Sequence, residues 1–272
     1  MKKLLLPKVL FVGPPRTGTT WIWEYLRTRG DIVLPERVKE TWFFSNMFHK
    51  GIEWYASHFK QRKDYSAVIE VDPSLFSHPE APNRVHEVLG SDVLVVVTVR
   101  DPVRRSWSHY LHARRYGWTR KPLEQAIQEI PDIIEASRYS KHIPRWKSVF
   151  GGKQVVILYY ETLAQSPEIF VRNMCSAIGL PIVDVPEQLF RRKVNISRDV
   201  RSQILIRTAM RLSKRLRSHR MYPVIDLFKR MGIQRILYKP LNKGYSLHPQ
   251  DRAMLFTLLK DEYDFLNVLN RH

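Results

Sequence analysis

The stretch at residues 8–21, KVLFVGPPRTGTTW, restricts the fold of this chain more than any other part of the sequence. Its apolar run at 9–12 predicts a buried strand, the Gly-Pro-Pro that follows ends that strand, and the residues from Trp21 onward are typical of a helix start. The first N–H groups of a helix lack intrahelical partners and the helix dipole is positive there, so an anion fits at this point. The stretch therefore predicts an α/β fold with a phosphate or sulfate site.

The loop between this strand and helix differs from a nucleotide-binding P-loop at one position. The pattern G-x-x-x-x-G-K-[ST] has its lysine directly after the second glycine, whereas here Gly18 is followed by Thr19. The only cation of the loop, Arg16, comes two residues before Gly18. Because the P-loop lysine serves a nucleoside triphosphate with Mg²⁺, the shifted cation favours another anion. Three hydroxyl groups add donors to the loop, those of Thr17, Thr19 and Thr20.

A second anion site is predicted at the end of the segment 93–99. This segment is apolar and rich in β-branched residues, as expected for a parallel strand that is covered on both faces. Arg100 follows it directly, at the edge where α/β sheets bind ligands, and Ser108 comes about two turns along the next helix. Arg100 and Ser108 are therefore placed to hold one anion together. The alternative is a structural Arg100, paired with Asp101 or Glu70.

Strands and helices alternate along the rest of the chain. Further strands are expected within 31–35, 66–71 and 155–159, and further helices within 51–59, 85–89, 103–116, 123–130, 133–150 with a kink or break near Pro144, 170–178 and 249–269. The last helix has an apolar stripe formed by Leu255, Leu258, Leu259, Tyr263, Leu266 and Leu269. The alternation predicts a P-loop-like parallel sheet flanked by helices on both faces. We expect a single domain over 1–272 with a basic helical insertion at about 191–240.

The charge of the chain is concentrated in one segment. The net charge is +19, and residues 191–243 hold 16 Lys/Arg against 2 Asp/Glu. Such a field favours anionic ligands. The single cysteine, Cys175, rules out an internal disulfide framework, and no apolar run approaches the ~20 residues of a membrane span. The N-terminal apolar run is interrupted by Pro7 and is too short for a signal-peptide core, so a cytoplasmic location is expected.

Both anion motifs resemble those of sulfotransferases that use 3′-phosphoadenosine 5′-phosphosulfate (PAPS). The loop PRTGTTW resembles the 5′-phosphosulfate loop P-K-[ST]-G-T-T-W, with Arg16 in place of lysine, and residues 99–110 resemble the 3′-phosphate motif. The resemblance implies PAPS as donor, adenosine 3′,5′-bisphosphate (PAP) as product, and no metal. It assigns the 5′-phosphosulfate to residues 16–20 and the 3′-phosphate to Arg100 and Ser108. Weaker matches imply three more cofactor contacts, by Trp21, Lys243 and Gly244.

A candidate base lies in the segment KETWFF at 39–44. This segment, with the H-x-G-x-x-W-Y pattern that begins at His49, resembles the heparan-sulfate-type sulfotransferases, in which the glutamate of K-E-x-x-F-F acts as base. The resemblance implies that Glu40 accepts the proton of the acceptor while Arg16 assists the leaving phosphate. The alternative is that Glu40 only pairs with Lys39 or with an arginine.

One departure from the family concerns residues 70–76, EVDPSLF. They resemble the segment E-K-[ST]-P-x-Y-F, but Val71 replaces the lysine and Asp72 replaces the hydroxyl residue. In the heparan-type enzymes that lysine lies near the transfer centre. Its replacement means that Arg16 or another cation must supply the charge.

These features together predict a sulfotransferase that moves a sulfuryl group from PAPS to a hydroxyl or an amine of a carbohydrate or glycoconjugate. Two alternatives are a P-loop kinase acting on a small molecule and a noncatalytic basic protein that binds nucleic acid or a membrane. Arg100 stands where a Mg²⁺-binding acid would be needed, which disfavours the kinase. Nucleic acid is not the expected partner. The basic segment 191–243 either attracts an anionic acceptor or contacts acidic lipid, and the oligomeric state stays open.

Overall fold

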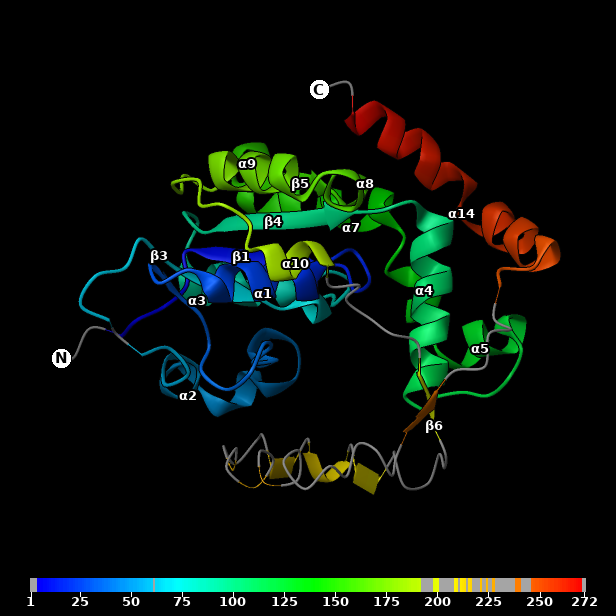
Figure 1. Cartoon of the computed structure of the whole chain (residues 1–272), viewed down its shortest axis with the longest axis horizontal. Helices are drawn as coiled ribbons and strands as arrows, with labels where there is room; N and C mark the ends of the chain where they lie inside the picture. The colour runs from blue at the N-terminus through cyan, green and yellow to red at the C-terminus, as the bar shows by residue number, and fades with distance from the viewer. Residues whose placement is uncertain are drawn as a thin grey trace.

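The core of the molecule is a five-stranded parallel sheet (Figure 1). A computed structural model describes residues 4–60, 62–191, 198–200, 238–240 and 246–270, together with isolated positions between 208 and 227. The strands follow the order β2-β3-β1-β4-β5. Their bounds are β1 (Val9–Gly13), β2 (Ile32–Val33), β3 (Ala67–Val71), β4 (Leu94–Val99) and β5 (Val155–Tyr159). The predicted P-loop-like α/β fold is confirmed.

Helices connect the strands and continue beyond them. The helices are α1 (Thr19–Thr28), α2 (Ile52–Ala56), α3 (Ala81–Leu89), α4 (Pro102–Arg115), α5 (Leu123–Glu129), α6 (Asp132–Glu135), α7 (Tyr139–Phe150), α8 (Tyr160–Gln165), α9 (Pro167–Ala177), α10 (Glu187–Arg191) and α14 (Pro249–Leu269). A short antiparallel pair is formed by β6 (Arg198–Val200) and β7 (Tyr238–Pro240). Among the described helices, none has the length and apolar character to cross a bilayer. The basic segment predicted at 191–240 lies largely outside the described residues.

Successive residues of each strand pack against opposite faces of the sheet. On β1, Leu10 and Val12 join one buried cluster with residues of α3 and α7, whereas Val9 and Phe11 join another with residues of α1 and α9. This follows from the two-residue period of a strand, which points neighbouring side chains to opposite sides. Both faces are therefore covered by helices, which is why β1 and β4 consist of continuous apolar runs.

A third cluster supports α4, the helix that carries Ser108. It consists of apolar residues from α4, α5, α6 and α14. Two buried leucines of α14, Leu255 and Leu259, belong to it, and the buried carboxylate of Glu262 accepts hydrogen bonds from Ser140 at the start of α7. The stripe predicted for this helix was wrong at Leu258, which is 41% exposed. The buried line follows positions i, i+4 and i+7 from Leu255, and Leu258 lies outside it, about 60° around the helix from Leu255.

The predicted break of the segment 133–150 lies earlier than expected. α6 ends at Glu135, and α7 runs from Tyr139 through Pro144 without interruption. Arg138, which precedes α7, has ψ 72°, outside the helical region, and the neighbouring Ser137 is buried, with its hydroxyl donating to the carbonyl of Pro102. A proline inside a helix removes one i to i−4 hydrogen bond, and the packed environment of α7 tolerates that loss.

Candidate active site

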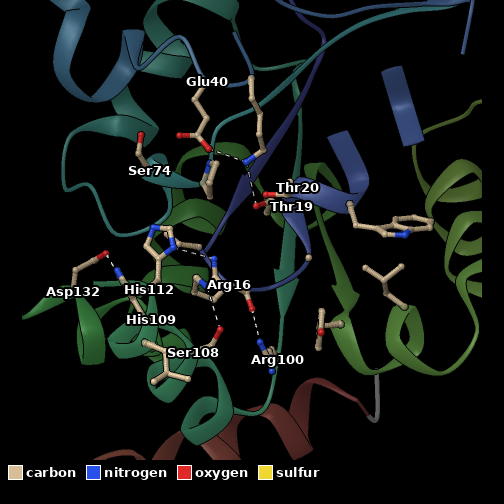
Figure 2. A pocket seen from close by; sticks show the side chains of 18 of the residues that line it. Arg16, Thr19, Thr20, Glu40, Ser74, Arg100, Ser108, His109, His112 and Asp132 are labelled. Atoms are coloured by element: carbon tan, nitrogen blue, oxygen red, sulfur yellow. Dashed lines mark hydrogen bonds and ion pairs between the residues drawn. The ribbon is translucent and has the colours of Figure 1, made fainter. Parts of the chain in front are cut away.

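One cavity of about 920 Å³ lies at the edge of the sheet where β1, β3, β4 and β5 end. Its walls come from the loop after β1, the residues that follow β3, β4 and β5, the side of α4, and the turn at 39–42 (Figure 2). The sequence-predicted site residues that line it are Arg16, Gly18, Thr19, Thr20, Trp21, Glu40, Arg100 and Ser108. Residues far apart in sequence, such as Arg16 and Ser108, which are separated by 92 positions, thus meet in one place.

The loop after β1 forms an open cradle of backbone N–H groups. Gly13, Arg16 and Gly18 all have positive φ values, of 95°, 78° and 89°. Gly18 precedes α1 without a side chain that caps the helix, so the N–H groups of the first turn keep their donor capacity. A Cβ at Gly18 would lie 2.6 Å from Leu163 Cδ2, which explains why glycine is needed at this position. Such a loop with a helix N-terminus is suited to binding an anion.

The guanidinium of Arg16 reaches across the cavity to α4. Its Nε donates to Ser108 Oγ at 3.1 Å, and its Nη1 lies 3.3 Å from Nδ1 of His112 (Figure 2). Burial, followed by the nearby charge of Arg100, lowers the pKa of Arg16 to about 10, so the side chain stays charged at neutral pH. The sequence assigned Arg16 and Ser108 to opposite ends of the donor, but the two side chains contact each other.

Arg100 lies beside Arg16 in the same cavity. Its Nη1 donates to the backbone carbonyl of Arg16 at 2.9 Å, and its guanidinium stacks over the ring of Tyr160 at 4.3 Å. The Nε of Arg100 is buried and has no hydrogen-bond partner among the described residues. The alternative pairing with Asp101 or Glu70 does not occur: Asp101 caps α4 through the N–H of Arg104, and Glu70 is bonded elsewhere. Arg100 therefore lines the cavity without an ion pair to either of these carboxylates.

Two histidines of α4, His109 and His112, line the cavity, although neither was predicted from the sequence as a site residue. Burial and the charge of Arg16 lower the pKa of His112 to about 3, and burial with the charge of Arg105 holds that of His109 well below its usual value. Both rings are neutral at pH 7. A signal was present in the sequence, because His112 follows Ser108 by four residues and so lies on the same face of α4.

The carboxylate of Glu40 faces the cavity and is held at both oxygens. Oε1 accepts from Lys39 Nζ at 2.7 Å, and Oε2 accepts from the indole N–H of Trp42 at 3.0 Å (Figure 2). The same ammonium group lies 3.4 Å from Thr19 Oγ1 at the start of α1. The ion pair with Lys39, one of the two sequence interpretations of Glu40, is present in the structure, and the other, a role as base, stays a prediction.

Two buried carboxylates hold the backbone that follows Glu40. Glu70 accepts from the N–H and hydroxyl of Thr41, at 3.0 and 2.6 Å. Asp72 accepts from the N–H of Trp42 at 3.1 Å, and Trp42 has a positive φ of 57° that these contacts maintain. Burial raises the pKa of both carboxyl groups. The residue between them on β3, Val71, is fully buried in the apolar core and brings no charge to the cavity.

Two predicted cofactor residues differ from expectation. Thr17 is fully buried and does not line the cavity, because its hydroxyl donates to the carbonyl of Pro14 at 2.7 Å and contacts that of Thr98. The predicted hydroxyl contact of Thr17 with an anion is therefore wrong. Trp21 lines the cavity but is largely core: its ring stacks on Tyr25 at 5.9 Å, and its indole N–H donates to the carbonyl of Leu189.

Other parts of the predicted site were missed or lie outside the description. Lys243 and Gly244 fall outside the described residues. Tyr160 and Phe190 line the cavity near Trp21 and were not singled out from the sequence. Tyr160 could have been found by the argument used for Arg100, because it directly follows β5 at the same edge of the sheet.

Comparison with known proteins assigns the family. A family model described as a sulfotransferase domain matches residues 6–207. The chain belongs to the sulfotransferase family. The resemblance inferred from the two anion motifs is thereby confirmed, and a sulfotransferase is an enzyme, so neither the small-molecule kinase nor the noncatalytic binding protein is retained.

Individual relatives agree with this assignment. The bifunctional heparan sulfate N-deacetylase/N-sulfotransferase 4 of Mus musculus is 27% identical over 197 residues, which cover 64% of this chain and 22% of that protein. The heparan sulfate glucosamine 3-O-sulfotransferase 3A1 of Mus musculus is 26% identical over 197 residues, which cover 64% of this chain and 46% of that protein. The matched region therefore spans less than half the length of each of these relatives.

A solved structure shares the fold. The crystal structure of a sulfotransferase from Alicyclobacillus acidocaldarius aligns with a TM-score of 0.59 at 22% identity, over 80% of this chain and 96% of that one. At this identity the likeness supports the arrangement of the sheet and helices.

Proposed function

We propose that this sulfotransferase moves a sulfuryl group from PAPS to a hydroxyl or an amine of a carbohydrate or glycoconjugate. One observation carries the proposal: the loop of Arg16, the strand end at Arg100 and the carboxylate of Glu40 open into a single cavity. A donor with two separate phosphate-like groups and an acceptor that must lose a proton both find suitable partners there.

The residues of the cavity fit PAPS, the donor implied by the family resemblance. The uncapped start of α1 offers N–H groups and the hydroxyls of Thr19 and Thr20 to the 5′-phosphosulfate. The guanidinium of Arg100 and the hydroxyl of Ser108 line the cavity and are assigned to the 3′-phosphate, with Arg16 between them. Two arginines next to a cavity with neutral histidines suit a ligand that carries several negative charges.

The transfer requires two contributions from the protein: a base for the acceptor proton and positive groups at the leaving phosphate. PAPS supplies a sulfuryl group bonded through oxygen to a phosphate that can leave. Glu40 takes the proton of the acceptor oxygen or nitrogen as the new bond to sulfur forms, and the bonding electrons of the old bond stay on the phosphate. Cations and N–H groups at the start of α1 stabilise the charge that develops on this leaving group.

The acceptor side of the cavity combines aromatic rings with small polar groups. Trp42 and Trp118 contribute rings, and Ser74, Ser77 and Asp132 contribute hydroxyl and carboxylate groups. Such a mixture binds a ring that carries hydroxyl groups. Two relatives are named for heparan sulfate, one for N- and one for O-sulfation, which supports a carbohydrate and leaves both acceptor atoms open. Attraction of the acceptor by the basic segment and a cytoplasmic location stay predictions from the sequence.

The donor is tested by calorimetry and labelled transfer. The purified chain is titrated with PAP in the presence of EDTA, and with ATP and Mg²⁺. It is then incubated with ³⁵S-labelled PAPS and a panel of glycans, glycolipids and small alcohols. We expect PAP to bind without metal and label to appear on a glycan. Binding of ATP with Mg²⁺ but not of PAP, or label on none of the glycans and glycolipids, contradicts the proposal.

The base is tested by replacing Glu40 with glutamine, which keeps the size and removes the proton acceptor. We expect Glu40→Gln to lower kcat by about 10²- to 10⁴-fold, the usual contribution of a general base. The affinity for PAP should stay within about twofold, because none of the residues assigned to the nucleotide changes. Glu124→Gln, at an exposed position of α5, is the matched control. Full activity of Glu40→Gln would remove Glu40 from the mechanism.

A further inference from the structure

The positive charge next to Glu40 comes from Lys39. Its ammonium group lies 2.7 Å from Glu40 Oε1 and 3.4 Å from Thr19 Oγ1, so it joins the carboxylate to the first residue of α1 (Figure 2). The side chain is 18% exposed and lines the cavity. Lys39 thus lies between the group that accepts a proton and the helix end that binds the leaving phosphate.

The other described cations that line the cavity have partners other than Glu40. Arg16 is bonded to Ser108 and His112 on α4, and Arg100 is bonded to the carbonyl of Arg16 and stacked on Tyr160. Arg115 lowers the pKa values of both Arg16 and His112, which places its charge on the α4 side as well. Among the cavity-lining cations that the structure describes, the hydrogen bonds therefore single out Lys39 as the one beside Glu40.

We propose that Lys39, and not Arg16, supplies the positive charge at the transfer centre. The proposal rests on the proposed sulfuryl transfer and deepens it. In the ligand-free site the ammonium holds Glu40; in the loaded site it faces the sulfuryl group above Thr19. The S–O bond to the 5′-phosphate breaks there with its electrons left on the phosphate, the S–O or S–N bond to the acceptor forms, and the acceptor proton goes to Glu40.

Lysine is suited to this exchange of partners. An ammonium group has three donors on a flexible stem, so Lys39 can keep one contact while it forms another. The indole N–H of Trp42 holds Glu40 Oε2 independently, at 3.0 Å, so the carboxylate stays in position when Oε1 loses its ammonium partner. Oε1 then becomes available to take a proton. Lys39 therefore acts on the sulfuryl group directly and on Glu40 as a positioning residue.

The proposal is tested with Lys39→Met, which keeps the length of the stem and removes the charge, and with Lys39→Arg, which keeps the charge. Lys60→Met is the matched control, because Lys60 forms a surface ion pair with Glu36 at 3.0 Å and does not line the cavity. Circular dichroism verifies folding. Affinities for PAP and, without acceptor, for PAPS are measured by calorimetry, and kcat is measured with the acceptor found in the labelled screen.

We expect Lys39→Met to lower kcat by about 10²- to 10³-fold, as when one donor to a developing negative charge is removed. Its affinity for PAPS should fall about tenfold, ~1.4 kcal/mol, whereas its affinity for PAP, which has no sulfuryl group, should stay within about threefold. Lys39→Arg should recover part of the rate. In a Glu40→Gln background, Lys39→Met should lower the rate further, because its charge acts on the sulfuryl group and not only through Glu40.

Several results would overturn the proposal. If Lys39→Met keeps kcat within about threefold, or loses affinity for PAP and PAPS equally, the charge is not at the transfer centre. If Lys39→Met has no effect in the Glu40→Gln background, Lys39 only positions the carboxylate. If Lys39→Met does not fold, the test relies on Lys39→Arg. Activity of Lys39→Arg at or below that of Glu40→Gln would then refute the proposed role of Lys39. A wild-type protein that neither binds PAP nor transfers label fails the proposed function instead.

Discussion

Replacing Arg100 by methionine should separate ligand affinity from stability. Methionine keeps the aliphatic stem and removes the guanidinium from the cavity wall. Hydrogen bonds from a charged donor contribute about 1.5–3 kcal/mol each, so we expect the affinity for PAP to fall by about 10- to 150-fold. The loss should be similar for PAP and PAPS, because the group bound by Arg100 is the 3′-phosphate that both carry.

The stability of the free protein should change little in the same variant. Arg100→Met removes a hydrogen bond to the carbonyl of Arg16 and a cation–π contact with Tyr160, each about 0.5–2 kcal/mol. It also removes a buried, unpaired N–H, which costs about 1–3 kcal/mol, and the repulsion that lowers the pKa of Arg16. The opposing contributions are of equal size, so we expect a melting temperature within about 4 °C of the wild type.

Two measurements check this prediction: calorimetric titration with PAP, and thermal unfolding followed by circular dichroism without ligand. Arg104→Met is the control, because Arg104 is exposed on the first turn of α4 and does not line the cavity. If PAP binds Arg100→Met within about threefold of the wild type, Arg100 does not hold a phosphate. If the melting temperature drops by more than about 8 °C, Arg100 is mainly a structural residue.

Two further predictions concern the loop and α4. Gly18→Ala should lower the stability by about 1–3 kcal/mol and weaken PAP binding, because φ is 89° and the new Cβ would press on Leu163. Thermal unfolding measures the stability and calorimetry measures the PAP affinity. An unchanged PAP affinity would show that the loop after β1 tolerates a side chain at this position. The depressed pKa of His112, about 3, means that the unfolded chain binds a proton that the folded chain does not. Stability therefore falls as pH drops below ~6.5, by about 2 kcal/mol for His112 by pH 5. Urea unfolding at pH 7 and 5 should show a smaller loss for His112→Gln, and equal losses would place the acid sensitivity elsewhere.

The strands that build the site could be predicted from local sequence. A parallel strand covered on both faces is an unbroken apolar run, and the residue after it lies at the ligand-binding edge. That rule placed Arg100 correctly, and the loop pattern placed Gly18 before α1. The same rule holds for Tyr160, which directly follows the shorter strand β5.

The directions of side chains could not be predicted in the same way. A motif gives the position of Thr17 and of Arg16, but whether a hydroxyl points into a cavity or beneath the loop depends on which strand lies below. Thr17 faces Thr98 of β4, 81 residues away in sequence, and Arg16 meets Ser108 of α4. The contact of Lys39 with Thr19 likewise depends on how the turn after β2 packs over α1. Such contacts form only in the assembled fold, so no pattern in the local sequence indicates them.

The charged residues of the cavity lie on two sides, with Arg16 and Arg100 on one and Glu40 on the other (Figure 2). On one side, Arg16 and Arg100 lie beside neutral histidines, so the positive charge there lacks a carboxylate partner among the described residues until an anion binds. On the other side, the carboxylate of Glu40 forms an ion pair with Lys39. A polyanionic donor relieves the repulsion between the arginines and so stabilises the folded state by mass action. Lys39 lies between the two sides, because its ammonium group contacts both Glu40 and Thr19. In the proposed transfer the sulfuryl group passes this ammonium group.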